Sequence, residues 1–285
     1  MPSTILSPKQ LNTRELFSVH QILLSRGFEV IQIDTIEKLL ITEEDSYNEI
    51  WTSLYNIYND ASLRSELKNF LYKKIAAKSD EVLKLITHLK FVNEYNRFDN
   101  TFEWFAGELM VTKFAAFSAS FGITIRDILR NSTGTDSGDY DSLVVLRDTN
   151  LAYFECKAGD FDNDDILKCY ERMLSLNCQY SILFCVEKIN EEKIIWNTQR
   201  VRIPVVDIHF LNKIYIKGKQ QDVVYDLNNC YVLDMTGSIE NKIRTVLRVN
   251  AAKINNMHYT ISPDNNTLGM LGYVVETIDI KRYSE

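Results

Sequence analysis

The sequence predicts an α/β protein in which a mainly helical N-terminal region precedes a mixed β-sheet with helices on both faces. Helix-periodic apolar patterns dominate residues 1–95, whereas strand-like apolar runs alternate with helical segments from residue 96 onward. Hydrophobic residues make up 45% of the 285 positions, enough for a substantial core, and only 4 Pro and 10 Gly argue against long linkers. We therefore expect two domains, 1–95 and 96–285, the second with a C-terminal extension from about residue 211.

The N-terminal domain is predicted to be helical over residues 13–26 and 47–92, with one strand at 28–33. Its regularly spaced aromatic and leucine residues are typical of a packed core rather than of a binding site. We expect this region to act in interaction, dimerisation or substrate clamping.

The next predicted element is a helix over residues 104–117 that is apolar nearly all round and ends near Gly122. Glu108 is therefore an acid on an element that mostly faces protein, where a carboxylate is normally paired, protonated or bound to metal. An ion pair from Glu108 to Lys113 is the structural alternative. Gly107 would let another backbone approach this helix closely.

A β-hairpin follows, with strands over residues 138–147 and from residue 151, joined by the turn-forming Asp148-Thr149-Asn150. If Arg147 pairs with Leu151 around this three-residue loop, Asp141 lies opposite Lys157. A slip of one residue would move Asp141 to the opposite face of the sheet. The hairpin thus predicts a specific geometry for its acidic residues.

The second strand of the hairpin ends in Glu155-Cys156-Lys157. Strand side chains alternate with a period of two, so Glu155 and Lys157 share a face, and in the predicted register Asp141 shares it too. The same spacing at residues 66–68, 191–193 and 240–242 falls in helical or polar surroundings. An exposed ion pair is the alternative at 155–157, but the apolar residues on both faces of these strands favour a covered, central position.

Residues 160–165 carry several acids that we expect to cap the N-terminus of a helix over 166–176. Lys168 and Arg172 lie one turn apart on its polar side and are candidate phosphate contacts. Further strands are predicted at 180–187, 205–210 and within 222–234, followed by a helix over 238–248. Although the formal net charge is −7, the stretch 196–253 is locally basic, and Arg200 and Arg202 within it are candidate nucleic-acid contacts.

The order of these elements, with Glu108 on the helix, Asp141 on the middle strand and Glu155-x-Lys157 on the next, resembles the PD-(D/E)XK nuclease superfamily. The stretches 139–141 and 154–159 are particularly similar to archaeal Holliday-junction resolvases and to the nuclease half of CRISPR-accessory nucleases. The resemblance covers roughly residues 100–210. Tyr140 stands where the proline of the family motif would precede the aspartate.

The resemblance implies a restriction-endonuclease-like α/β/α core and Mg²⁺- or Mn²⁺-dependent hydrolysis of phosphodiesters in nucleic acid. Asp141, Glu155 and Glu108 would bind the metal with the Cys156 carbonyl, and Lys157 would be the catalytic lysine. DNA is favoured over RNA as the substrate, and a role in microbial defence or DNA processing is expected. The protein could also form a homodimer. The alternatives are a non-catalytic nucleic-acid or protein binder on this fold, or a latent nuclease activated by a partner or nucleotide.

Several other classes of protein are disfavoured by the composition. The 5 cysteines form no Cys-x-x-Cys pair and the 4 histidines show no ligand spacing, so reduced thiols are expected rather than disulfides, zinc or iron–sulfur clusters. No apolar run approaches the roughly 18 residues of a membrane span, and no secretory segment begins the chain. We expect a soluble, cytoplasmic protein without a membrane partner.

Overall fold

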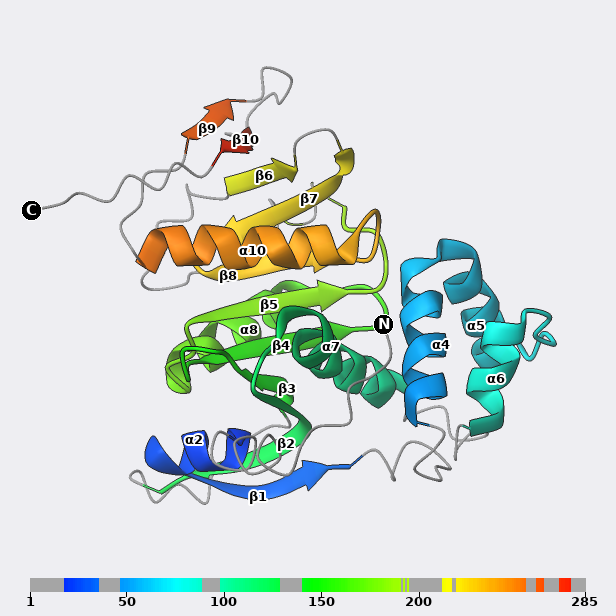
Figure 1. Ribbon diagram of the computed structural model, residues 1–285, viewed down its shortest axis with the longest axis horizontal. Coiled ribbons are helices and arrows are strands. Elements are labelled where there is room, and N and C mark those ends of the chain that lie inside the picture. The colour runs from blue at the N-terminus through cyan, green and yellow to red at the C-terminus, as the bar shows by residue number, and fades with distance from the viewer. Residues whose placement is uncertain are drawn as a thin grey trace, which may run out of the picture. The chain divides into compact units, whose positions relative to one another are not determined.

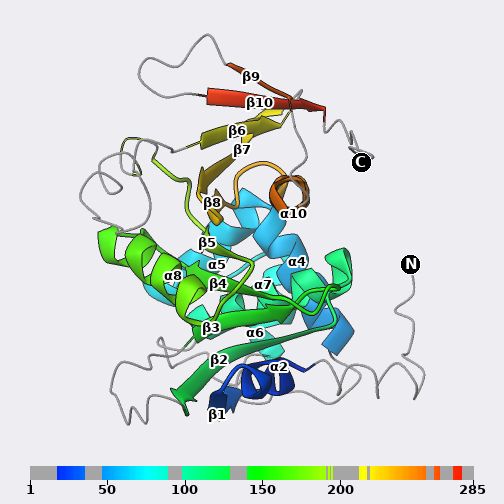
Figure 2. The ribbon, with the colours of Figure 1, turned by 90° about the vertical axis from the view of Figure 1, so that its left-hand side faces the viewer.

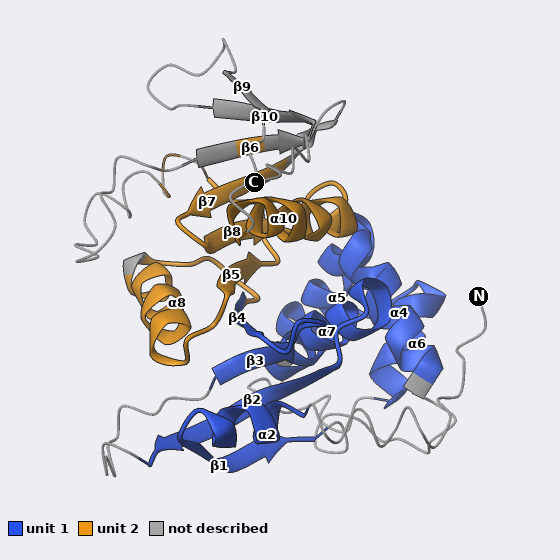
Figure 3. Ribbon diagram, turned by 60° about the vertical axis from the view of Figure 1, so that its left-hand side comes forward, with its two compact units in different colours: residues 1–156 blue, residues 157–285 orange. Residues whose placement is uncertain are grey.

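The computed structural model describes residues 18–35, 47–88, 98–128, 140–190, 192, 194, 212–216, 219–254, 260–263 and 272–277 (Figure 1). These residues belong to two compact units, 1–156 and 157–285 (Figure 3). The predicted domain boundary near residue 95 is not where the structure divides. Together the elements confirm the α/β class, the mixed sheet and the helical N-terminal region.

The sheet of the first unit consists of four antiparallel neighbours. In spatial order they are β1 (Phe28–Asp34), β2 (Ser118–Asp127), β3 (Tyr140–Val145) and β4 (Leu151–Lys157), whose last residue begins the second unit. Every residue of β3 is buried, as are the first five of β4. These strands are therefore covered on both faces, as their apolar sequences predict.

The helices of the first unit are α2 (Val19–Ser25), α4 (Tyr47–Asn59), α5 (Ala61–Lys73), α6 (Asp80–His88) and α7 (Phe98–Phe114). Aromatic side chains join α4 to α7: the Phe105 ring lies 5.4 Å from that of Trp51 and 4.5 Å from that of Tyr58. Strand β1 also pairs with β2. Helix α4 thus shares a core, and strand β1 shares a sheet, with elements that follow residue 95.

Helix α7 ends earlier than the predicted residue 117. Ala115 adopts a left-handed conformation with φ of 56°, and the Ala116 N–H closes the last turn on the Met110 carbonyl at 3.0 Å. The Phe117 N–H then donates to the Val145 carbonyl at 2.9 Å. This bond draws the chain into β2, which begins at Ser118, directly after the helix has ended.

The second unit contains a mixed sheet in the order β5–β8–β7–β6–β10–β9. Its strands are β5 (Tyr180–Cys185), β6 (Asn212–Ile216), β7 (Lys219–Leu227), β8 (Cys230–Asp234), β9 (Thr260–Pro263) and β10 (Gly272–Thr277). The pairs β5/β8 and β6/β10 are parallel, and the others are antiparallel. The predicted strand at 205–210 lies outside the described residues.

Two helices cover the sheet of the second unit, α8 (Asn163–Ser175) and α10 (Ile239–Ile254). They lie on opposite faces of β5 and β8 (Figure 2). Asp162 is the N-cap of α8, and its side chain forms a capping box with Asp165, which confirms the predicted role of this acidic segment. No helix among the described residues is long and apolar enough to cross a membrane.

Candidate active site

The β3–β4 hairpin has the three-residue loop that the sequence predicts, but one residue earlier, at 147–149. Ser142 pairs with Phe154, and the pairing continues to Leu146, whose N–H donates to the Asn150 carbonyl at 2.8 Å. Thr149 takes a left-handed conformation at the third loop position, with φ of 66°. This geometry is common for three-residue hairpin loops.

The predicted register is therefore wrong by two positions, since Leu151 pairs with Val145 rather than with Arg147. Because the shift is even, every side chain keeps its predicted face. Continuing the observed register by one pair beyond Ser142 places Asp141 opposite Glu155. The observed register thus makes Glu155, rather than Lys157, the residue expected opposite Asp141.

Asp141 and Glu155 are both buried, with 8% and 0% of their surfaces exposed. Asp141 Oδ2 accepts a hydrogen bond of 2.7 Å from the backbone N–H of Cys156. This bond ties the aspartate to the strand that carries Glu155. A charge-assisted bond of this kind is stronger than one between neutral groups, and it fixes the direction of the carboxylate.

Glu155 is held by a tyrosine on its own strand. The hydroxyl of Tyr153, two residues earlier and thus on the same face, donates a short hydrogen bond to Glu155 Oε2. Tyr153 has no exposed surface, and the Tyr140 ring packs edge-on against it with centroids 5.7 Å apart. The carboxylate at the centre of the predicted motif is therefore oriented by a rigid, buried side chain.

Lys157 is the last residue of β4, and its carbonyl accepts a bond of 2.9 Å from the Val186 N–H. Its ammonium pairs with Asp165 Oδ1 at 2.7 Å. The other carboxylate oxygen of Asp165 accepts from the backbone N–H of Asp162 at 2.9 Å, which completes the capping box. Asp165 thus joins the lysine to the first turn of α8.

Glu108 occupies the middle of α7 and is half-buried in a helix that is otherwise largely covered, as predicted. A Cβ atom on the preceding Gly107 would lie 2.8 Å from Ser142 Oγ and 2.9 Å from Ala119 Cβ. Helix α7 therefore packs on the sheet face that carries Ser142. By strand alternation, Asp141 points to the opposite face.

These positions bear on the predicted metal site. Among the described residues, the structure brings together no group of three or more His, Cys, Asp or Glu side chains that could hold a metal ion. Asp141 and Glu155 lie on adjacent strands, which the bond from the Cys156 N–H to Asp141 Oδ2 joins, and one or two carboxylates with several waters suffice for Mg²⁺. The two acids fit such an ion, while the roles of Glu108 and the Cys156 carbonyl stay predictions.

The predicted nucleic-acid contacts are partly described. Lys168 and Arg172 are half-buried on α8, whereas Arg200 and Arg202 lie outside the described residues. Other cations of the basic stretch are engaged with acids. Lys242 pairs with Asp234 and Lys253 pairs with Asp226, each at 2.5 Å. These two lysines therefore stabilise the second unit and do not add to a basic surface.

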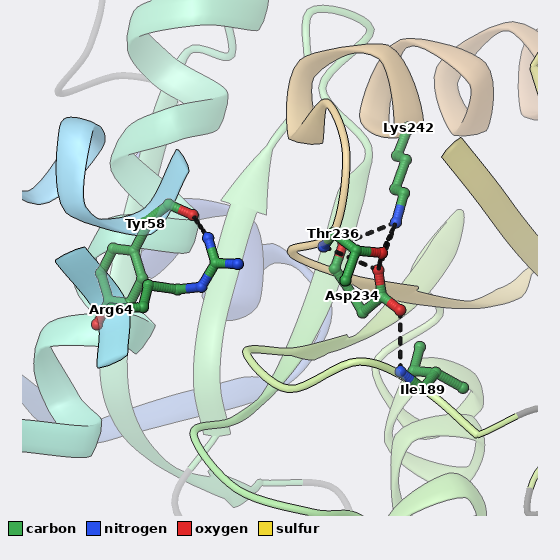
Figure 4. A network of polar contacts seen from close by, with 6 residues as sticks. All are labelled: Tyr58, Arg64, Ile189, Asp234, Thr236 and Lys242. Carbon is green, nitrogen blue, oxygen red and sulfur yellow. Dashed lines mark hydrogen bonds and ion pairs between the residues drawn. The ribbon is translucent and has the colours of Figure 1, made fainter. Parts of the chain in front are cut away.

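The Asp234–Lys242 pair is a deeply buried charge cluster that the sequence did not reveal (Figure 4). The Lys242 side chain is 1% exposed, and its ammonium also donates to the Asp234 carbonyl at 3.0 Å. Asp234 accepts further bonds from the Ile189 N–H at 2.9 Å and from the Thr236 N–H at 3.0 Å. Burial alone would raise the pKa of Asp234, but Lys242 and these bonds outweigh it and hold the pKa below its usual value.

All five cysteines are free thiols, and three of them are buried. Cys185 ends β5, and burial raises the pKa of its thiol. The negative charges of Asp234 and Asp165 raise this pKa further, while Lys157 opposes them. Burial therefore disfavours the thiolate form of Cys185, which is the form that acts as a nucleophile.

Two residues of the site were missed from the sequence. Tyr153 could have been found, because its two-residue offset from Glu155 places it on the same face of β4. Asp165 was interpreted only as a capping residue, since nothing in the spacing indicates that the chain between 157 and 165 folds back. No protein-family model and no curated protein matches the chain.

Proposed function

We propose that the chain is a metal-dependent nuclease that hydrolyses phosphodiester bonds in nucleic acid, with DNA favoured over RNA, in microbial defence or DNA processing. The observation that carries the proposal is the placement of Asp141 and Glu155 on adjacent, paired strands, both buried and, by strand alternation, on the same face of the sheet. Buried carboxylates are costly unless they are paired, protonated or bound to a cation. The succession α7, β2, β3, β4, α8, β5 also follows the order expected from the family resemblance.

In this proposal, Asp141 and Glu155 bind Mg²⁺ or Mn²⁺ through carboxylate oxygens, which are the ligands such hard cations prefer. The ion would supply charge neutralisation at the scissile phosphate and a bound water of lowered pKa. Lys157 would orient the attacking water or contact the phosphate. Tyr153 and the Cys156 N–H keep the two carboxylates in fixed directions, which limits the reorganisation needed before reaction.

The test is a cleavage assay with single-stranded, duplex, supercoiled and branched DNA and with RNA, in the presence of Mn²⁺ or Mg²⁺. Wild type should cut at least one substrate, and Glu155→Gln and Lys157→Ala should each abolish cutting. Lys68→Ala is the matched control, because Lys68 ends a Glu-x-Lys sequence of the same spacing and is exposed on helix α5. Cleavage without metal, or cleavage that survives both substitutions, would contradict the proposal.

A binding measurement separates the nuclease from a non-catalytic binder. A binder would retain nucleic acid with or without metal, and Glu155→Gln would leave its affinity unchanged. Binding of Mn²⁺, followed by calorimetry, should weaken in Asp141→Asn and Glu155→Gln but not in Lys68→Ala. Cutting that starts only after addition of a nucleotide or protein partner would identify a latent enzyme.

A further inference from the structure

The backbone of Lys157 is anchored, but its side chain needs a separate restraint. The bond from the Val186 N–H to its carbonyl fixes the end of β4. A lysine ammonium sits on a flexible four-carbon stem and loses its position unless another group holds it. Asp165 Oδ1, at 2.7 Å, is such a group.

The Lys157–Asp165 pair is better shielded than a typical surface ion pair. Its side chains are 24% and 17% exposed, whereas those of Arg244 and Glu240 on α10 are 54% and 28% exposed and lie 4.0 Å apart. Exposed pairs contribute little because water and salt screen them. We therefore expect the Lys157–Asp165 pair to restrain the Lys157 side chain.

Asp165 is itself held rigidly at the start of α8. Its Oδ2 accepts from the Asp162 N–H at 2.9 Å, and its own N–H donates to Asp162 Oδ1 at 3.1 Å. This capping box uses one carboxylate oxygen of Asp165 and leaves the other directed at Lys157. The cap itself does not require the ion pair, since a neutral side chain at this position of a capping box also serves.

We propose that Asp165 is a positioning residue that holds the Lys157 ammonium in place for phosphodiester hydrolysis. The inference rests on the proposed nuclease function and deepens it. Asp165 acts through Lys157 and not on the substrate. Loss of its charge should therefore lower kcat and leave KM for nucleic acid nearly unchanged.

The experiment compares Asp165→Gln with Asp165→Glu, because both side chains suit this capping-box position and they differ only in charge. Asp165→Gln should lower kcat by about 10- to 100-fold, the range expected when a reacting group is displaced by up to about 1 Å. Asp165→Glu should restore most of the loss. Asp162→Ala is the folding control: it removes the Asp162 Oδ1 acceptor but keeps the backbone N–H that Asp165 binds.

A second readout does not depend on cleavage. Acylation of Lys157 by a succinimidyl ester, measured by peptide mass spectrometry, should be several-fold faster in Asp165→Gln than in wild type and should change much less in Asp162→Ala, which keeps the Asp165 carboxylate. Unchanged kcat in Asp165→Gln, an equal loss in Asp165→Glu, or equal acylation rates would overturn the positioning role. If wild type cuts nothing, the nuclease proposal fails and the positioning role fails with it, whereas the acylation rates still decide whether Asp165 restrains Lys157.

Discussion

Gly107 of α7 lies so close to Ser142 of β3 that a Cβ atom on the glycine would come within 2.8 Å of the serine Oγ. The contact lets the helix backbone rest directly on the strand next to Asp141. Ser142 Oγ is buried and has no hydrogen-bond partner among the residues that the structure describes. The sequence predicted that Gly107 permits close approach, but not which strand it meets.

Replacing Gly107 by alanine should destabilise the protein even though alanine is the better helix former. The helical gain is about 1 kcal/mol, whereas overpacking against Ser142 and Ala119 costs about 1–3 kcal/mol. We expect a net loss of about 1 kcal/mol in the free energy of unfolding, measured by urea denaturation. Gly159→Ala is the control, since its added Cβ meets nothing within 4 Å, and a similar loss there would refute the packing explanation.

Removing the Tyr153 hydroxyl should remove one hydrogen bond from the buried Glu155 carboxylate. We expect Tyr153→Phe to lower the free energy of unfolding by about 1–3 kcal/mol, because the buried Glu155 carboxylate loses a donor and keeps its desolvation cost. In a double-mutant cycle, Tyr153→Phe should cost little in the Glu155→Leu background. Additive losses in the cycle would show that the hydrogen bond does not contribute.

For the buried Asp234–Lys242 pair, replacing one partner should destabilise the protein more than replacing both partners. Asp234→Asn is expected to cost about 3–5 kcal/mol, because it leaves the Lys242 ammonium buried without a countercharge. The double variant Asp234→Asn/Lys242→Met should be markedly more stable than Asp234→Asn alone. Thermal unfolding of the three proteins tests this, and a double variant less stable than Asp234→Asn would count against it.

The same pair predicts a pH dependence. The pKa of Asp234 in the folded chain lies below its value of about 3.9 in the unfolded chain, so the unfolded state binds more protons between the two values. The stability that Asp234 contributes is complete above about pH 5 and is lost as the pH falls through the folded pKa. The difference between wild type and Asp234→Asn should therefore shrink as the pH falls below about 5, whereas a constant difference would contradict the assignment.

Thr149 offers a stabilising substitution. Its φ of 66° is unfavourable for a β-branched residue and free of strain for glycine. Thr149→Gly should raise the free energy of unfolding by up to about 1 kcal/mol, as measured by thermal denaturation. Asn229 has a φ of 72° in the β7–β8 turn, and Asn229→Gly should gain less because asparagine tolerates this conformation.

The faces of the hairpin were predictable and its exact pairing was not. An odd number of loop residues puts Asp141 and Glu155 on one face wherever the loop falls. The predicted loop ended at Asn150, a residue that favours the left-handed conformation. In the structure Thr149 takes that conformation, and the Asn150 N–H bonds to Asp148 Oδ1 at 3.2 Å. The hydrogen bond to the Asp148 side chain therefore outweighs the preference of Asn150 for the left-handed conformation.

The Lys157–Asp165 and Asp234–Lys242 ion pairs could not be predicted from the sequence, for a different reason. Lys157 and Asp165 are close only because the chain turns between the end of β4 and the start of α8. Asp234 and Lys242 meet through a similar return between β8 and α10. Neither turn has a strong local signature, so the choice of partner depends on tertiary packing.

The loop at residues 147–149 also sets which changes of length the hairpin can accept. Adding or removing one residue there would turn Asp141 to the face that packs on α7, where Ser142 now lies. Adding or removing two would return it to the side of Glu155, with a different neighbour. Length variation in this loop is therefore expected in steps of two, and distant relatives should be aligned with that constraint.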